Sequence, residues 1–175
     1  MHIKGKKIVM IIAPAKFRDE ELFHTREYLE EHGAEITVAS KTTNTATGMM
    51  GGTSEVDITI DQIDPGAYDA VIFVGGGGSE VYFDDPKAHN IAKNAFKAKK
   101  LVCAICIAPS ILAKAGLLDG RKATVWEGDK YVKILKSHGA TYTGKKVTRH
   151  GRIITGNGPQ AARRFAEKIG EQLEG

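Results

Sequence analysis

The sequence predicts an α/β fold: a three-layer sandwich in which helices cover both faces of a mainly parallel, flavodoxin-like sheet. Continuous apolar runs at residues 7–13, 68–74 and 101–105 are typical of strands buried on both faces. Segments with helical spacing of apolar residues alternate with these runs along the chain. The length of 175 residues suits one domain, which we place at residues 1–175.

The first half of the chain can be assigned element by element. A strand at 7–13 leads through a loop at 14–17 into a helix at 19–31, whose first turn is acidic and which Gly33 ends. A second strand follows at 34–40. Residues 41–57 lack a clear period and predict short strands or an excursion over the surface. An alternating segment at 56–60 suggests an edge strand, and a turn at 64–66 precedes the third buried strand at 68–74.

The second half continues the alternation. We expect helices at 86–99, 129–137 and 160–173. A further helix is expected to begin after the turn that contains Cys106 and to end at about residue 114. Strands are expected at 101–105, 123–125, 141–142 and 146–149, and after the turn at 150–151 a last strand at 152–155. No repeat, low-complexity segment or linker interrupts the pattern.

Composition narrows the class of protein. The chain is 42% hydrophobic and 26% charged, with a net charge of +4, which is ordinary for a soluble domain. The lysine clusters at 97–100 and 145–146 are not interleaved with aromatic residues, so we expect no nucleic-acid partner. The apolar run at 8–13 is too short to span a membrane and no cleavage site follows it, so we expect a cytoplasmic protein without membrane contact.

The apolar run at 101–105 ends at Cys106, and a helix with Pro109 in its first turn begins at once. A strand, a sharp turn with a thiol at the corner and a helix make the layout of a nucleophile elbow, where backbone N–H groups favour a thiolate. Two alternatives remain open. Cys106 could be an inert core thiol, or it could form a redox pair with Cys103, although Cys103 falls inside the strand. Two cysteines are too few for a zinc site, and we expect no metal or cofactor.

Three loops meet at the edge where parallel strands end, which is where ligands bind in such sheets. They carry the acidic residues 19–21, the four glycines 75–78, and Cys106. The glycines could supply oxyanion-hole amides, a phosphate-binding loop or only a tight turn. None of the histidines that could partner Cys106 has a context that directs it to this edge: His24, His89, His138 and His150.

Several motifs resemble the DJ-1/PfpI superfamily, which has a class I glutamine amidotransferase-like fold. The sequence A-I-C-I-A-P at 104–109 resembles the A-I-C-x-G-P elbow of that superfamily. F-R-D-E-E-L at 17–22 resembles its F-x-D-x-E-L segment, whose last acid falls on Glu21. Y-D-A-V-I-F-V-G-G-G at 68–77, L-L-D-G-R-K-A-T at 117–124 and N-G-P at 157–159 extend the resemblance over nearly the whole chain.

The resemblance implies a role for each residue of the site. Cys106 is the reactive cysteine, and Glu21 is the acid that shares a hydrogen bond with its sulfur. The oxyanion-hole donors are the amides of Gly77, or its neighbour Gly76, and of Ile107. We place Trp126, Ala108 and Pro109 around the pocket. Members of this superfamily commonly form dimers or larger rings, so we expect a homo-oligomer, with a dimer favoured.

Departures from the superfamily pattern decide between activities. PfpI-type members carry His directly after the cysteine, where this chain has Ile107, and Trp126 occupies the region where DJ-1 proteins carry a His. Without a histidine base a PfpI-type protease or amidase is disfavoured. We therefore expect a glyoxalase-like or deglycase-like enzyme acting on small carbonyls such as methylglyoxal. The alternative is a non-catalytic sensor or chaperone of oxidative stress that works through Cys106 oxidation.

Overall fold

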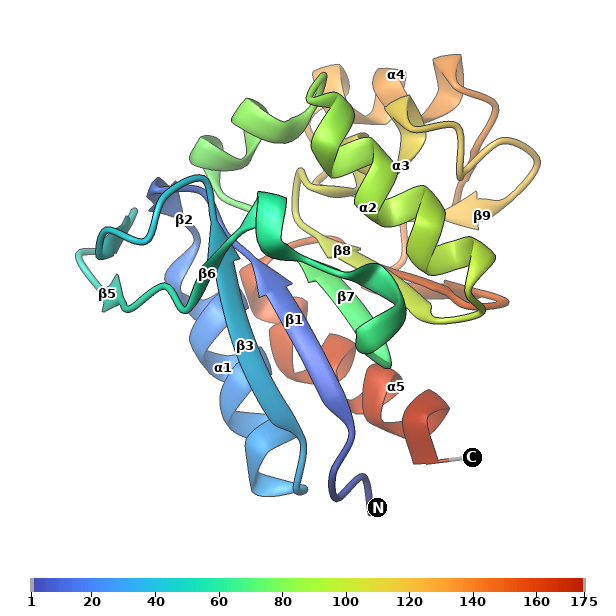
Figure 1. The fold of residues 1–175 in the computed structure, drawn as a ribbon. Helices are drawn as coiled ribbons and strands as arrows, with labels where there is room; N and C mark the ends of the chain where they lie inside the picture. Colours follow the sequence, from blue (N-terminus) through green and yellow to red (C-terminus); the bar gives the residue numbers. More distant parts are fainter. Residues whose placement is uncertain (1, 175) are drawn as a thin grey trace.

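A seven-stranded sheet lies at the centre of the protein, whose computed structural model describes residues 2–174. Its strands lie in the order β11-β12-β8-β7-β1-β3-β6 (Figure 1). Neighbouring strands are parallel throughout, except that β11 runs antiparallel to β12. The predicted mainly parallel sheet is confirmed. The strands are β1 Lys7–Ile11, β3 Glu35–Ser40, β6 Ile58–Thr59, β7 Ala70–Phe73, β8 Leu101–Ile105, β11 Val147–His150 and β12 Ile153–Gly156.

Helices cover both faces of this sheet, which completes the predicted three layers. Helices α1 and α5 pack against each other behind the sheet in Figure 1, while α2 lies in front of it and contacts α3, which in turn contacts α4. The helices are α1 Asp19–Glu31, α2 Pro86–Lys97, α3 Pro109–Lys114, α4 Asp129–Ser137 and α5 Ala162–Glu174.

The central strands are buried on both faces, as their continuous apolar runs predict. Val9 of β1, Ile72 of β7 and Val102 of β8 have no exposed surface. Burying one such side chain contributes about 1.5–3 kcal/mol relative to leaving it in water. The three strands that carry the candidate site at their ends therefore belong to the buried core of the fold.

The short elements differ most from the sequence prediction. Residues predicted as a loop contain strand β2 (Ala15–Phe17), which pairs with β4 (Ala46–Gly48), and β4 pairs with β5 (Thr53–Ser54). Strand β9 is Lys122–Ala123 and pairs with β10 (Thr141–Tyr142) in a separate two-stranded sheet. A 3₁₀ helix at Gly77–Tyr82 was not predicted. These elements are too short for a sequence period to reveal them. Contacts with distant segments determine their conformation instead.

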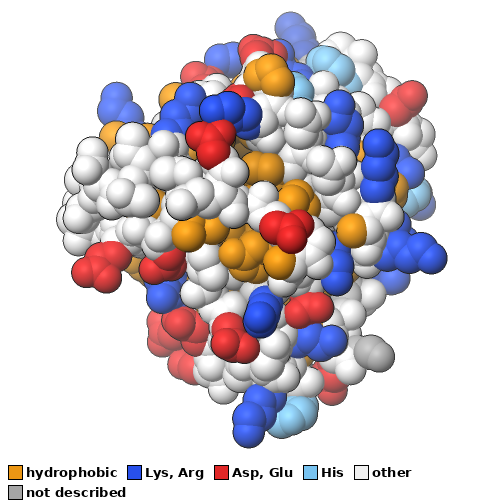
Figure 2. All heavy atoms as spheres, in the orientation of Figure 1, with side chains coloured by type: hydrophobic (Ala, Val, Ile, Leu, Met, Phe, Trp, Pro, Cys, Tyr) orange, Lys and Arg blue, Asp and Glu red, His pale blue; other side chains and the backbone are white. Residues whose placement is uncertain are grey.

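The surface shown in Figure 2 carries Lys, Arg, Asp and Glu side chains interspersed around a central group of hydrophobic side chains. None of the helices within residues 2–174 is long and apolar enough to cross a membrane.

The strand order places a topological switch point beside β1. The chain passes from β1 to β3 on one side and later returns to β7 on the other side. A crevice forms where the connections leave the sheet in opposite directions. The segments that follow β1, β7 and β8 meet at this crevice, and they carry the three groups that the sequence singled out.

Candidate active site

Cys106 occupies a strained corner between β8 and α3. Its backbone has φ of +66°, a left-handed conformation that is uncommon for residues other than glycine. The Cys106 N–H donates to the Gly156 carbonyl at 2.9 Å, and its carbonyl accepts from the Trp126 N–H at 2.8 Å. These two bonds hold the strained turn, and this geometry is that of a nucleophile elbow.

Glu21 projects from the first turn of α1 and is fully buried against this corner. Its Oε1 accepts a hydrogen bond from the Gly75 N–H at 3.0 Å, and the carboxyl group lies beside the Cys106 side chain. A Cβ at Gly75 would lie 2.5 Å from the Cβ of Cys106 and 2.6 Å from Oε1 of Glu21. Only glycine at this position leaves room for the carboxyl and thiol groups to meet.

Burial keeps a proton on this pair of groups. Desolvation raises the pKa of Glu21 to about 8, although its bonds with Cys106 and Gly75 oppose the rise. Burial and the charge of Glu21 together raise the pKa of Cys106, while bonds from the Gly76 and Ile107 amides oppose that rise. The two groups titrate as one coupled pair. When Glu21 holds the proton, its repulsion of the thiolate disappears and the two amides stabilise the sulfur.

The two amides that reach the sulfur belong to Gly76 and Ile107. Of the two glycines named from the sequence, Gly76 supplies the amide and Gly77 lines the cavity beside it. Gly76 has φ of +98°, and a Cβ there would collide with the backbone nitrogen of Arg18 and lie 2.7 Å from the carbonyl carbon of Phe17. The glycine run therefore turns the chain tightly and brings a backbone donor to the thiol.

A cavity of about 210 Å³ opens onto Cys106. Trp126, which is 41% exposed, forms part of its wall, as the sequence predicts. Ala108 and Pro109 lie buried where α3 begins and are not part of the wall of this cavity. The wall consists of Arg18, Met49, Gly76, Gly77, Cys106, Ile107, Trp126, Tyr131 and Pro159.

Arg18, Met49 and Tyr131 are wall residues that the sequence did not single out. Tyr131 comes from α4, and its hydroxyl donates to Oε1 of Glu80 at 3.2 Å. Met49 comes from the excursion after β3 and is 47% exposed. Neither position carries a motif, because the fold alone brings these segments to the crevice. Arg18 could have been found from its place inside the F-R-D-E-E-L segment.

The three acidic residues in the first turn of α1 contact different groups. Asp19 accepts hydrogen bonds from the Met50 N–H at 2.8 Å and the Gly52 N–H at 2.7 Å, which fixes the loop that carries Met49. Glu20 accepts two bonds from the Arg18 guanidinium, each 3.0 Å long, and these lower the pKa of Glu20. Of the three, Glu21 is the one that contacts Cys106.

No histidine within the described residues lines this cavity. His89 Nε2 lies 2.7 Å from the Phe83 carbonyl, and His138 Nδ1 lies 2.8 Å from the Ile134 carbonyl. His150 accepts from the Lys122 N–H, and His24 lines a separate surface cavity. Cys103 is a free, fully buried thiol inside β8, and burial raises its pKa. Glu21 is thus the titratable group that partners Cys106.

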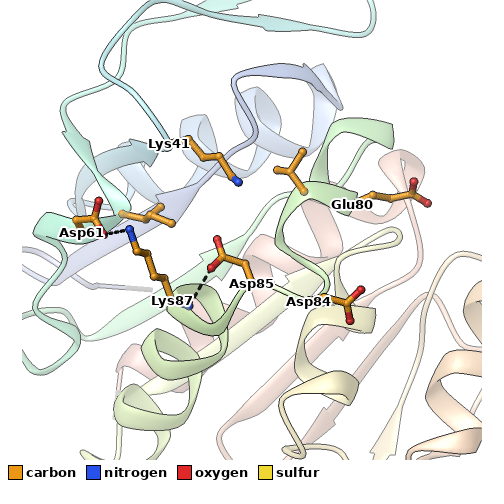
Figure 3. Close-up of a pocket in the computed structure, with 8 residues that line it drawn as sticks. Lys41, Asp61, Glu80, Asp84, Asp85 and Lys87 are labelled. Carbon is orange, nitrogen blue, oxygen red and sulfur yellow. Dashed lines mark hydrogen bonds and ion pairs between the residues drawn. The ribbon is translucent and has the colours of Figure 1, made fainter.

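A larger cavity, of about 490 Å³, lies elsewhere on the surface and carries several carboxylates (Figure 3). Asp61 pairs with the Lys87 ammonium at 2.7 Å, and Asp85 accepts from the Lys87 N–H at 2.9 Å. Asp84 pairs with Lys114 at 3.0 Å. Among the described residues no cluster of side chains is arranged to hold a metal ion. Because each carboxylate already has a partner, we assign no function to this cavity.

Two archaeal proteins are similar in sequence to this chain. The chain is 37% identical over 174 residues to an uncharacterised protein of Methanocaldococcus jannaschii, covering 99% of this chain and 85% of that protein. It is 38% identical over 122 residues to a protein of Pyrococcus horikoshii named as a deglycase, covering 70% of this chain and 74% of that protein.

A solved structure has a fold similar to that of this chain. The structure of a ThiJ/PfpI domain protein from Brachyspira murdochii superposes with a TM-score of 0.94 at 29% identity, covering 98% of each chain. The family model described as the DJ-1/PfpI family matches residues 6–172. The match spans every helix and strand that builds the site, and the chain therefore belongs to the DJ-1/PfpI family.

Proposed function

We propose that this protein is a cysteine-dependent enzyme of the glyoxalase or deglycase type that acts on small reactive carbonyls such as methylglyoxal. One observation carries the proposal: a buried carboxyl group with a raised pKa lies beside the elbow thiol, and that thiol lines a small cavity. The naming of the Pyrococcus horikoshii relative as a deglycase supports it. The cavity of about 210 Å³ favours small substrates.

The first step is addition of the Cys106 thiolate to the aldehyde carbon. A C–S bond forms, and the carbonyl π-electrons move to oxygen. The amides of Gly76 and Ile107, which already face the sulfur, are placed to stabilise this developing oxyanion. Glu21, protonated near neutral pH, then gives its proton to the oxygen and yields a neutral hemithioacetal.

The second step converts the hemithioacetal into a hydroxy acid. Glu21, now a carboxylate, removes the proton from the former aldehyde carbon and returns it to the neighbouring ketone carbon through an enediol. The first carbon is oxidised and the second is reduced, so no external oxidant is required. The product is a thioester of Cys106, which water hydrolyses to lactate and the free thiol.

Lactate formation from methylglyoxal tests the proposal. The wild-type protein is expected to form lactate, and Cys106→Ala to lose that activity. Cys103→Ala is the matched control, because Cys103 is a free thiol within β8, the strand that ends just before Cys106, and it does not line the cavity. Equal lactate formation by the wild type and Cys106→Ala would refute the enzyme proposal.

Oxidation of Cys106 is a second candidate function, and one observation favours it. Oε2 of Glu21 is buried and has no hydrogen-bond partner within the described residues. A sulfinate on Cys106, formed by two equivalents of peroxide with loss of water, would accept bonds from this protonated carboxyl and from the two amides. Mass spectrometry after mild peroxide treatment is expected to find two added oxygens on Cys106. Preferential oxidation of other residues would count against this role.

A protease or amidase of the PfpI type remains disfavoured. Such a mechanism needs a base with a pKa near neutrality that activates the thiol and then protonates a leaving amine. The cavity wall carries Trp126 and Ile107 where the family pattern offers a histidine. A carboxylic acid in that environment suits proton transfer within a small carbonyl compound better than peptide hydrolysis.

A further inference from the structure

A second cavity adjoins the one above Cys106. It has a volume of about 400 Å³ and shares three wall residues with the smaller cavity: Arg18, Trp126 and Pro159. A molecule that is longer than methylglyoxal and whose carbonyl group reaches Cys106 therefore has room to extend past these residues into the larger space. The chemistry of that space bears on which substrates the site accepts.

Arg18 stands at the junction of the two cavities and is only partly paired. Its Nε and Nη2 atoms bind the two carboxylate oxygens of Glu20, each at 3.0 Å. Its Nη1 atom has no hydrogen-bond partner in the described part of the chain. The guanidinium also interacts electrostatically with Glu21 and Cys106, so its charge acts at the reacting sulfur. Its side chain is 27% exposed, which leaves it accessible from the cavity.

The larger cavity contains more hydrogen-bond donors than negative charges. Lys146 contributes a second cation, and Asn157 and Gln160 contribute side-chain amides. Lys146 forms no ion pair within residues 2–174. Glu127 is the one carboxylate in this wall, and it is exposed to solvent. The cavity that continues from the thiol is therefore suited to an anionic group.

We propose that Arg18 determines substrate specificity by binding an anionic group, so that the preferred substrates are 2-oxoaldehydes that carry a carboxylate or a phosphate. This inference rests on the proposed function, because it assigns the substrate class of the same site. The aldehyde lies over the Cys106 sulfur, and the anion lies between Arg18 and Lys146. Guanidinium groups bind both kinds of oxyanion through paired N–H donors.

Two alkylating reagents of nearly equal size test the proposal without turnover. Iodoacetate is an anion and iodoacetamide is neutral, and both react with the Cys106 thiolate. We expect Arg18→Met to lower the ratio of the iodoacetate to the iodoacetamide rate constant by about tenfold, which corresponds to loss of one charge-assisted hydrogen bond. Arg18→Lys should restore part of the ratio, and Lys146→Met should lower it less.

Arg26→Met is the matched control. Arg26 lies on α1, the helix that begins directly after Arg18. It pairs with Glu30 at 3.0 Å, so its removal also costs one positive charge and one ion pair, but it lines neither cavity. Its ratio should equal that of the wild type. A merely structural effect of Arg18→Met would slow both reagents equally, and an unchanged ratio would overturn the proposal.

Turnover measurements then distinguish a carboxylate from a phosphate as the anionic group of the preferred substrate. Among 2-oxoaldehydes of similar size, those carrying a carboxylate or a phosphate should each be compared with methylglyoxal, in the wild type and in Arg18→Met. The anionic compound with the larger loss of kcat/KM identifies the preferred group, and equal losses for the neutral and anionic compounds would contradict the proposal. If no dicarbonyl is converted, the enzyme proposal fails, while the alkylation ratio still decides the role of Arg18.

Discussion

At the scale of single residues, the candidate site depends on two buried acidic groups that lie beside each other, Glu21 and Cys106. Glu21 and Cys106 each prefer the neutral form when taken out of water, and each has a raised pKa. The amides of Gly76 and Ile107 oppose the rise in the pKa of Cys106 and so favour its thiolate. No histidine within the described residues lines the cavity, whose wall includes Ile107 and Trp126.

The raised pKa of Glu21 predicts that stability falls as the pH rises. Between pH 4.5 and 8 the folded protein retains a proton that the unfolded chain has released, so the free energy of unfolding decreases with pH across this window. The full effect is roughly 5 kcal/mol. Glu21→Gln should remove this decline, as measured by urea denaturation at a series of pH values.

Glu20→Gln provides the control for that series. The pKa of Glu20 is lowered by its bond to Arg18, so its contribution to stability is present above the ordinary range of a carboxyl group and is lost on acidification. This variant should keep the decline between pH 4.5 and 8. A wild-type protein whose stability is constant across that window would contradict the raised pKa of Glu21.

At the scale of elements, the site depends on how tightly the glycine run after β7 passes β2 and the loop before α1. Gly76 and Gly51 both have positive φ, at +98° and +93°, but only Gly76 has backbone atoms in the space that a Cβ would occupy. Gly51→Ala should cost about 1–2 kcal/mol from backbone strain alone. Gly76→Ala should cost a further 1–3 kcal/mol or so from the collision and displace an amide from Cys106.

Urea denaturation of the two variants, together with the rate of Cys106 alkylation, measures both effects. Gly51→Ala should alkylate at the wild-type rate, while Gly76→Ala should alkylate more slowly because the thiolate loses a donor. Equal stability of the two variants would show that the close approach at Gly76 is not energetically important.

The long elements of the fold could be predicted from the sequence, and the reason is physical. The apolar runs of β1, β7 and β8 are long enough to indicate strands buried on both faces, and α1 contains enough residues to show helical spacing of its apolar side chains. Strand β2 has three residues, one of them Lys16 with φ of +61°, and forms because β4 lies beside it. Its sequence alone carries no such signal.

Some residues of the candidate site could likewise be predicted from the sequence, and others could not. Cys106, Glu21 and the glycine run follow strands that meet at one edge, so sequence order and the rules of parallel sheets bring them together. The choice of Glu21 over Asp19 and Glu20 needed the family resemblance, and the hydrogen bonds of the three acids agree with it. Tyr131 and Met49 reach the cavity through tertiary packing alone, which no local pattern reports.

At the scale of the whole molecule, we expect a homodimer, and exposed hydrophobic residues beside the site support self-association. Met49 is 47% exposed and Met50 is 65% exposed. Sedimentation velocity at micromolar concentrations should find a dimer, and Met50→Lys should weaken it. Val81 is 46% exposed and lines the cavity of about 490 Å³ shown in Figure 3. Val81→Lys should leave the dimer intact. A monomer at every concentration would refute the expectation.

The central claim is that Cys106 forms a covalent bond with the carbonyl substrate while Glu21 moves its proton. Acid-quenched reactions with methylglyoxal, digested and examined by mass spectrometry, test it most directly. The account predicts a substrate adduct on the wild-type peptide that contains Cys106 and a larger amount of that adduct in Glu21→Gln. The corresponding peptide of Cys106→Ala should carry no adduct. Lactate formed without any adduct on Cys106, or adducts confined to lysine and arginine side chains, would contradict it.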